Sequence, residues 1–221
     1  MPESTEEPTN KINIIKSLKI SWPFLIFCVV NIAYQLIIMP STEFFSSDFI
    51  AAFYKSILAG LLEEVIFRYW LQNKISQFLE KKNKNKIFAI FIASIIFGLI
   101  HLINIKDLGI DKTILQIISA TFGGILFGSL YYKTNNISCT IILHILYDIG
   151  AYLSNIVDTS DIINYVSEIM LILFCALISF DLLKNDIINN KNQIKTFINS
   201  TAYRILFILL VVVLIVGIEF A

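Results

Sequence analysis

The chain has 221 residues, of which 57% are hydrophobic and 15% are charged, and its formal net charge is zero. A soluble domain typically has about 25% charged residues, and the mean hydropathy here is +0.76. This composition excludes an ordinary soluble domain and indicates an integral membrane protein. It gives no sign of a nucleic-acid partner, because no basic face with interleaved aromatic residues accompanies the balanced charge.

A polar leader comes first along the chain, and a membrane-spanning region follows it. Residues 1–19 are predicted to form the leader, without a signal peptide, and residues 20–220 to form a single transmembrane bundle. Seven apolar segments, each near the ~20 residues that cross a bilayer, cover residues 20–39, 49–70, 87–105, 114–132, 137–156, 163–183 and 202–220. The second is predicted to continue as a helix to about residue 79. We therefore expect an all-α, polytopic transmembrane helix bundle of about seven spans.

The basic residues between these segments predict the orientation of the chain. With a cytoplasmic N-terminus, Lys106 and Lys112 belong to the outer connections, and Lys55 and Arg68 lie inside the second segment. The other 13 of the 17 Lys and Arg residues are then cytoplasmic. This asymmetry agrees with the positive-inside rule, so we expect the N-terminus in the cytoplasm.

Small residues at helical spacing mark the places where helices are expected to approach closely. Gly124 and Gly128 form a GxxxG pattern, Ser94 and Gly98 form a similar pair, and Gly60 precedes two glutamates. In membranes such positions allow helix backbones to pack tightly. We interpret all of them as packing contacts.

Ionisable side chains within the predicted spans are the strongest functional signal in the sequence. Each costs about 2.5–3.5 kcal/mol at the centre of a membrane helix, so such residues persist where they face a bundle interior or a wet cavity. In this chain they are Lys55, Glu63, Glu64, Arg68, His101, His144, Asp148 and Glu168. The chain has only two histidines, and both belong to this set.

The sequence ILAGLLEEVIFRYW, residues 57–70, contains two glutamates that are expected to have different environments. Arg68 lies four residues after Glu64, on the same helix face, and is predicted to pair with it. Glu63 points about 100° away around the helix and is therefore freer to take part in chemistry.

Together these residues supply the groups that amide hydrolysis needs. A free carboxylate such as Glu63 near an imidazole can take a proton from water. A second imidazole with a carboxyl partner, as in His144 and Asp148, can stabilise charge that develops on a carbonyl oxygen. No serine or cysteine lies in an evident nucleophile setting, so we expect water to be the nucleophile.

Structural and non-catalytic interpretations of the same residues stay open. A buried Glu–Arg pair can lock two helices together, and a membrane histidine can bond across helices without any catalysis. A non-catalytic membrane immunity or scaffold protein would bind a toxin or partner through the same bundle. A transporter would use Glu63 and His101 as a proton relay, although the sequence shows no internal repeat or pair of broken helices.

Three motifs, in this order along the chain, carry a resemblance to a known family. EEVIFR (63–68) matches EExxxR, FGLIH (97–101) matches FxxxH, and HILYD (144–148) matches HxxxD. Over about residues 49–156, which we take as the catalytic core, the chain resembles the CPBP family. That family comprises the type II CAAX prenyl endopeptidases and their bacterial Abi-like and lysostaphin resistance A-like relatives.

The resemblance implies an intramembrane endopeptidase. Glu63 would activate the attacking water with assistance from His101. Glu64 and Arg68 would order the site.

The third motif would supply the group that stabilises the oxyanion, through His144 and Asp148. The prenyl endopeptidases carry Asn at the position of Asp148, and Asn is a ready donor whereas an ionised Asp only accepts. Asp148 is therefore also interpreted as a carboxylate that orients His144.

The resemblance also bears on the cofactor, the substrate and the location. Bacterial members are commonly labelled metalloproteases, so Glu63, His101 and His144 form an alternative set of zinc ligands; because HExxH is absent, we favour catalysis without a cofactor. The expected partners are the lipid bilayer and a prenylated or otherwise hydrophobic peptide. The Ile-, Asn- and Lys-rich composition suggests an AT-rich bacterial source and the bacterial plasma membrane, where relatives are associated with bacteriocin or signal-peptide processing and self-immunity.

Overall fold

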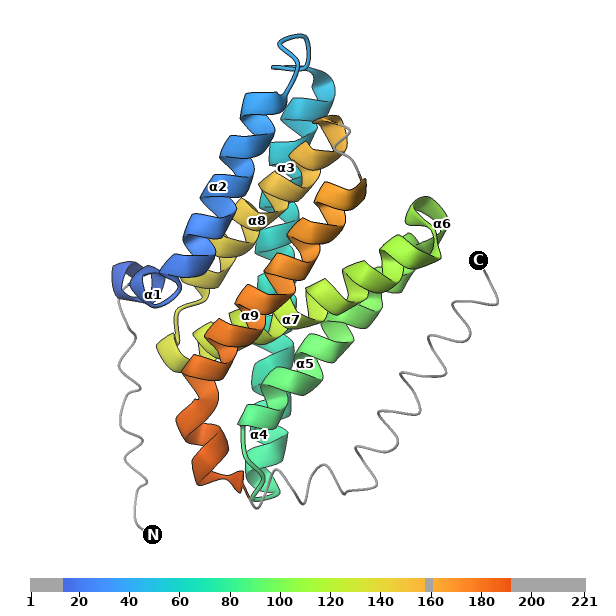
Figure 1. Cartoon of the computed structure of the whole chain (residues 1–221). Coiled ribbons are helices and arrows are strands. Elements are labelled where there is room, and N and C mark those ends of the chain that lie inside the picture. Colours follow the sequence, from blue (N-terminus) through green and yellow to red (C-terminus); the bar gives the residue numbers. More distant parts are fainter. Residues whose placement is uncertain (1–13, 158–160, 192–221) are drawn as a thin grey trace.

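The computed structural model describes residues 14–157 and 161–191, and this part of the chain is helical without any strand (Figure 1). Two of its segments are not regular α-helices: η1 is a π-helix and η2 is a short 3-10 helix. In chain order the elements are α1 (Ile14–Ile20), α2 (Trp22–Ile38), α3 (Ser47–Glu64), η1 (Val65–Gln72), α4 (Asn73–Lys81), α5 (Ile87–Ile100), η2 (His101–Asn104), α6 (Ile105–Leu108), α7 (Ile110–Thr134), α8 (Ile137–Val157) and α9 (Asp161–Asn189).

The predicted spans agree with the helices in place but not always in length. Among the described residues, four helical segments are long and apolar enough to cross a membrane: α5 through α6, α7, α8 and most of α9. Helices α1 and α2 would make a fifth span as a pair, although they are bent by 82°. The all-helical class is confirmed, and four or five of the expected seven spans are supported.

The structure describes only part of the two ends of the predicted layout. The last predicted span, residues 202–220, lies outside the described residues, as do the first 13 residues of the predicted leader. The rest of that leader is not irregular, because Ile14–Ile20 form helix α1.

The second predicted segment becomes one helical rod that contains α3, η1 and α4. It begins at Ser47, where the side chain of Ser46 accepts a hydrogen bond from the backbone of Phe49, and it ends at Lys81. The predicted continuation to about residue 79 is therefore confirmed. The rod is not one of the four apolar helices, and it carries Lys55 and the three ionisable residues of EEVIFR within its length.

The small residues do mark close helix packing, as predicted. A Cβ atom on Gly98 of α5 would lie 2.0 Å from Thr121 Oγ1 on α7, and one on Gly124 would lie 2.9 Å from the Cβ of Ser94. On the other side of the bundle, a Cβ on Gly60 would lie 2.7 Å from Ile145. Glycine at these positions allows α5 to approach α7, and α3 to approach α8.

Helix α8 is at the centre of this arrangement. It packs against α2 and α3, while α7 packs against α5 and α9, and the views in Figure 1 show these helices crossing around the middle of the molecule. A buried apolar cluster that includes Phe24, Leu126, Leu143 and Leu171 joins α2, α7, α8 and α9. This packing brings residues of the three motifs, which lie on the α3–α4 rod, α5 and α8, close to one another.

Candidate active site

The change from α-helix to π-helix falls directly after the two glutamates. Glu63 and Glu64 are the last residues of α3, and η1 begins at Val65. A π-helix has a wider turn than an α-helix and is found frequently at functional sites. Along this stretch Glu64, Arg68 and Gln72 are buried, so the rod presents one polar stripe to the interior. The sequence carried no signal for the π-helix.

Glu64 is fully buried and has two partners. Its Oε1 atom lies 3.4 Å from Nε of Arg68, one turn along the same rod. The same oxygen accepts a hydrogen bond of 2.9 Å from Nδ1 of His144 on α8. The predicted Glu64–Arg68 pair is confirmed, and the contact with His144, which connects two of the motifs, was not foreseen.

Glu63 lies on the other side of the same imidazole and is more accessible. Its Oε2 atom is 3.5 Å from Nε2 of His144, and its side chain is 32% exposed, compared with 0% for Glu64. Asp148 Oδ2 is 3.7 Å from the same nitrogen. The expected difference between the two glutamates is therefore present, and both lie beside His144.

His144 is the centre of this cluster. It is buried, its Nδ1 faces Glu64, and its Nε2 faces Glu63 and Asp148. Its ring also stacks on Phe127 of α7, with centroids 5.1 Å apart and an angle of 25° between the rings. Sequence reasoning missed Phe127, because the phenylalanine belongs to none of the three motifs.

Arg68 is buried among aromatic rings. Its guanidinium carbon lies 4.5 Å from the ring centroid of Phe97 and 5.7 Å from that of Phe127. Such contacts stabilise a cation through the electron-rich ring face. The phenylalanine of the FxxxH motif thus has a visible role, since it packs on the arginine of the EExxxR motif.

His101 lies at the point where α5 ends and η2 begins. Its Nδ1 is 3.0 Å from the carbonyl oxygen of Phe97, and because a carbonyl only accepts, this nitrogen carries the proton. In the tautomer with this proton, Nε2 is an acceptor. In the described part of the chain no ion pair joins His101 to a glutamate, and the imidazole that Glu63 contacts directly is that of His144. The role of His101 beside the attacking water stays a prediction. His101 reaches the cluster through Phe97, with ring centroids 5.1 Å apart.

The alternative zinc ligands would have to lie close together to bind a metal ion. Among the residues that the structure describes, no group of three or more His, Cys, Asp or Glu side chains could hold a metal ion. The alternative zinc ligands Glu63, His101 and His144 therefore do not converge as a metal site here.

Glu168, the remaining acidic residue of the predicted spans, belongs to a different contact. Its Oε1 atom accepts a hydrogen bond of 3.2 Å from the hydroxyl of Tyr147. This bond joins α9 to α8 one residue before Asp148. Packing thus accounts for Glu168.

Comparison with known proteins gives one family match. The model of the family described as "Type II CAAX prenyl endopeptidase Rce1-like" matches residues 45–150, which include all three motifs. No curated protein and no solved structure matches the sequence significantly.

Proposed function

The chain belongs to the family of Rce1-like type II CAAX prenyl endopeptidases, as the match over residues 45–150 indicates, and from this premise we propose that it hydrolyses a peptide bond by water activated at Glu63. The proposal rests on the unequal exposure of the three carboxylates beside His144. Glu63 is 32% exposed, whereas Asp148 is 15% exposed and Glu64 is buried. A general base needs access to water, and Glu63 has the most.

The proposed first step is a proton transfer at Glu63. The carboxylate takes a proton from a water molecule, and the water oxygen forms a bond to the carbonyl carbon of the peptide. The electron pair of the carbonyl bond moves to its oxygen, which becomes an oxyanion. His101, through its unprotonated Nε2, is proposed to help position the water.

His144 is proposed to stabilise that oxyanion. Its Nδ1 donates to Glu64, and its Nε2, which faces Glu63 and Asp148, is proposed to carry the second proton, because ionised carboxylates only accept hydrogen bonds. Glu64 holds Nδ1 at 2.9 Å, which fixes the ring and leaves the Nε2 proton to be shared between nearby oxygens. When the tetrahedral intermediate collapses, the carbon–nitrogen bond breaks and Glu63 gives its proton to the leaving nitrogen.

Catalysis is proposed to proceed without a metal. In this mechanism Glu63 performs the proton transfers and His144 stabilises the charge, so no Lewis acid is required. The poor convergence of the alternative ligands supports this preference.

The proposed substrate is a hydrophobic or lipid-modified peptide at the membrane. Exposed apolar side chains flank Glu63 on the same rod, among them Leu61, Leu62 and Ile66. They suit a substrate that reaches the site from the bilayer. Processing of a bacteriocin or signal peptide, or self-immunity, in a bacterial plasma membrane is the proposed setting.

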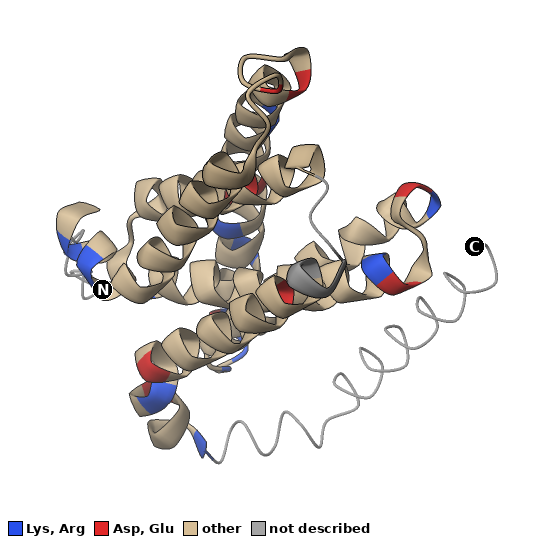
Figure 2. Ribbon diagram, turned by 45° about the horizontal axis from the view of Figure 1, so that its top comes forward, with Lys and Arg blue, Asp and Glu red and all other residues tan. Residues whose placement is uncertain are grey.

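A cytoplasmic N-terminus is part of the proposal. The connection between α4 and α5 is rich in lysine. The opposite end of the α3–α4 rod carries two acidic residues, Glu43 in the α2–α3 connection and Asp48 in the first turn of α3 (Figure 2). By the positive-inside rule the lysine-rich end would be cytoplasmic.

A cleavage assay with a matched pair of variants tests the function. Wild type, Glu63→Gln and Glu43→Gln would be purified in detergent and screened against membrane-peptide substrates by mass spectrometry. We expect cleavage by the wild type and Glu43→Gln, which changes a loop carboxylate, and none by Glu63→Gln with an unchanged Tm. Equal cleavage by Glu63→Gln would overturn the role of Glu63. No cleavage by any protein, with retained binding of a peptide partner, would instead support a non-catalytic immunity or scaffold protein.

A further inference from the structure

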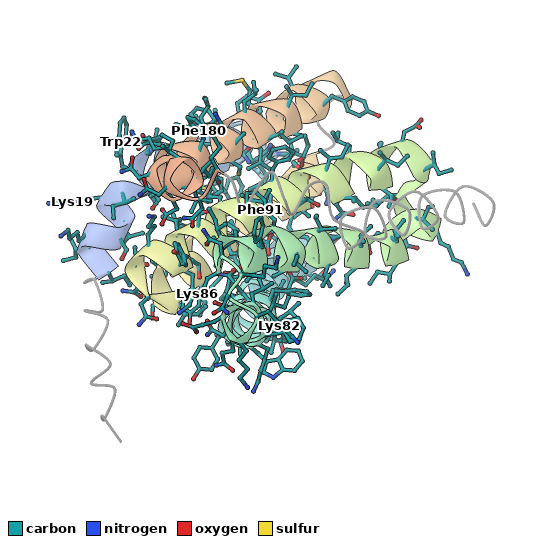
Figure 3. The ribbon with its side chains drawn as sticks, turned by 90° about the horizontal axis from the view of Figure 1, so that it is seen from below. Lys19, Trp22, Lys82, Lys86, Phe91 and Phe180 are labelled. Atoms are coloured by element: carbon teal, nitrogen blue, oxygen red, sulfur yellow. The ribbon has the colours of Figure 1, made fainter. Side chains whose placement is uncertain are left out.

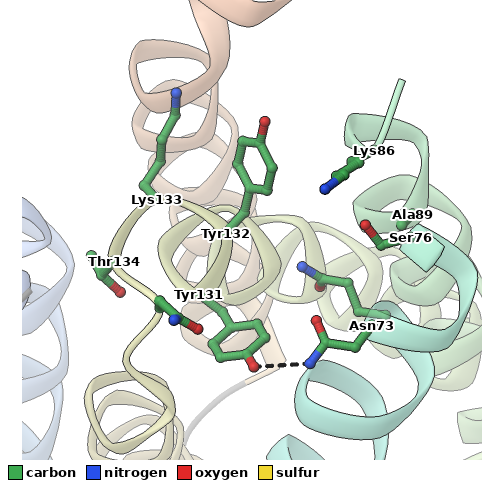
Figure 4. Close-up of a pocket in the computed structure, with 10 residues that line it drawn as sticks. Asn73, Ser76, Lys86, Ala89, Tyr131, Tyr132, Lys133 and Thr134 are labelled. Carbon is green, nitrogen blue, oxygen red and sulfur yellow. Dashed lines mark hydrogen bonds between the residues drawn. The ribbon is translucent and has the colours of Figure 1, made fainter. Parts of the chain in front are cut away.

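A polar pocket lies apart from the catalytic cluster, between α4, α5 and the end of α7 (Figure 4). Its volume is about 340 Å³, within the ~300–1,000 Å³ that small-molecule sites occupy. Among its lining residues are Gln72, Asn73, Ser76, Lys86, Tyr131 and Lys133. No acidic side chain lines it, and its amide, hydroxyl and ammonium groups can all donate hydrogen bonds.

The donors of this pocket are not all used within the protein. Lys86 pairs with Glu80 at 2.8 Å, and Lys133 pairs with Asp186. An ammonium group has three donors, so each lysine keeps donors for a further acceptor. Figure 4 shows the Lys86 side chain reaching toward the pocket from the residue directly before α5.

The hydroxyl of Tyr131 adds a neutral donor inside the pocket. It accepts a hydrogen bond of 3.0 Å from the side-chain amide of Asn73, and this leaves its own proton available. Figure 4 draws this bond at the centre of the lining residues. The pocket thus combines two ammonium groups, each also paired with a carboxylate outside the lining, with a hydroxyl donor.

The surroundings of the pocket favour an anion. The segment from residue 74 to residue 86, which we call the lysine-rich end, contains Lys74, Lys81, Lys82, Lys84 and Lys86 and one acidic residue, Glu80. Viewed from below, Lys82 and Lys86 lie beside the end of α4 (Figure 3). Lysine is a common phosphate binder as a point charge, and a phosphate supplies only acceptors.

The position of the pocket favours a phosphate held at the membrane surface. Exposed aromatic side chains on the same rod, Tyr69, Trp70 and Phe78, are of the kind enriched at the membrane–water interface. Basic pockets between membrane helices on the cytoplasmic side are known to bind anionic headgroups. We propose that this pocket binds the phosphate of an anionic phospholipid headgroup.

A headgroup bound in this pocket would lie next to the α3–α4 rod, which carries the catalytic cluster. Gln72, which lines the pocket, closes η1 and donates a hydrogen bond of 3.1 Å to the carbonyl of Gly128 on α7. Arg68 lies one turn before it, in the catalytic cluster. A bound headgroup would therefore stabilise the contact between the rod and α7. This proposal does not depend on the proteolytic activity.

Thermal unfolding of the full chain in detergent micelles tests the proposal. Phosphatidylglycerol, phosphatidylcholine and inorganic phosphate would be added separately to wild type, Lys86→Gln and Lys82→Gln. The last variant removes the same charge from the α4–α5 connection without changing the pocket lining. We expect phosphatidylglycerol alone to raise the Tm of wild type and, somewhat less, that of Lys82→Gln, and its apparent affinity to fall at least fivefold only in Lys86→Gln.

Three results would overturn the proposal. Equal responses to the two lipids would show no headgroup selectivity, and equal losses in both lysine variants would show diffuse charge attraction. A phosphate effect as large as that of phosphatidylglycerol would identify a free-phosphate site instead. If Lys86→Gln does not fold, Ser76→Leu, which fills the pocket without changing charge, is expected to reduce the phosphatidylglycerol response in the same way.

Discussion

His144 on α8 donates a hydrogen bond of 2.9 Å to the buried carboxylate of Glu64 on α3. This one oxygen also faces Arg68 at 3.4 Å, so Glu64 is the group through which two of the three motifs meet. Its neighbour Glu63 contacts the same imidazole from the accessible side. The adjacent glutamates are therefore expected to respond differently to the same substitution.

Glu64→Gln is expected to destabilise the protein, whereas Glu63→Gln is expected to leave stability nearly unchanged. Removing the charge of Glu64 leaves Arg68 buried and unpaired, and breaking a buried ion pair in this way costs about 3–5 kcal/mol. Glu63 is partly exposed, so its loss breaks no buried pair. Denaturant unfolding of both variants in detergent measures the difference. Equal free energies of unfolding for the two variants would contradict the assignment.

Replacing Arg68 as well should recover much of the stability that Glu64→Gln loses. The double variant Glu64→Gln/Arg68→Met removes the unpaired cation and keeps an apolar side chain against Phe97 and Phe127, where apolar replacement of a buried pair is often neutral or stabilising. We expect its free energy of unfolding to exceed that of Glu64→Gln by at least 2 kcal/mol, on the order of the unpaired-charge penalty. Peptide cleavage is not expected to recover with stability, because Glu64 no longer holds His144 through an ionised carboxylate. A double variant no more stable than Glu64→Gln alone would count against the pair as the source of the effect.

Asp148→Asn should preserve activity better than Asp148→Ala. Asp148 Oδ2 is 3.7 Å from His144 Nε2, beyond hydrogen-bond distance, while Glu64 already holds the other ring nitrogen. Asn fits the same space and keeps a polar side chain that can donate to an oxyanion, whereas Ala leaves the space beside His144 empty, so Asp148→Ala is expected to lose more activity. The comparison is made by measuring the rates of peptide cleavage by the two variants. Equal loss in both would show that the carboxylate charge itself is needed.

The sequence predicted contacts within one helix better than contacts between helices. Helical spacing along one rod was enough to predict the Glu64–Arg68 pair, because both residues belong to the same helix. The bond from Glu64 to His144 crosses 80 residues of sequence and depends on how α3 packs on α8, which spacing does not determine. For the same reason Glu63 was expected beside His101, although its close imidazole is His144.

The fold shows a similar division between what was predicted and what was not. Hydropathy located the apolar helices, and small residues located the α5–α7 contact, because both are local patterns. The π-helix η1 and the bend between α1 and α2 have no comparable pattern, since they result from packing of the whole bundle. The stacking of His144 on Phe127 was hidden in the same way, in a helix that carries no motif.

Chelation is expected to leave peptide cleavage unchanged. The alternative ligands Glu63, His101 and His144 do not form a metal site in the described part of the chain, and the proposed steps use side chains alone. Cleavage would be measured before and after treatment with EDTA and 1,10-phenanthroline, with protein-bound zinc determined by mass spectrometry. Activity that is lost on chelation and restored by zinc would establish a metalloprotease.

Gly98→Ala should destabilise the bundle, and Gly123→Ala provides its matched control. The added Cβ at Gly98 would lie 2.0 Å from Thr121 Oγ1 and 2.8 Å from the carbonyl oxygen of Ile117. Because the second is backbone, α5 and α7 must move apart, and overpacking of this kind typically costs about 1–3 kcal/mol. At Gly123 a Cβ meets nothing within 4 Å, so alanine should be neutral or stabilise the helix by up to about 1 kcal/mol.

The two glycine variants also report on the site, because α5 carries Phe97 and His101 and α7 carries Phe127. Separation of these helices should weaken the contacts of Phe97 and Phe127 with Arg68, so Gly98→Ala is expected to lower cleavage as well as Tm. Gly123→Ala should change neither. Gly98→Ala with the stability of wild type but reduced cleavage would place the effect in the site alone, and normal values of both would refute the close approach of α5 and α7.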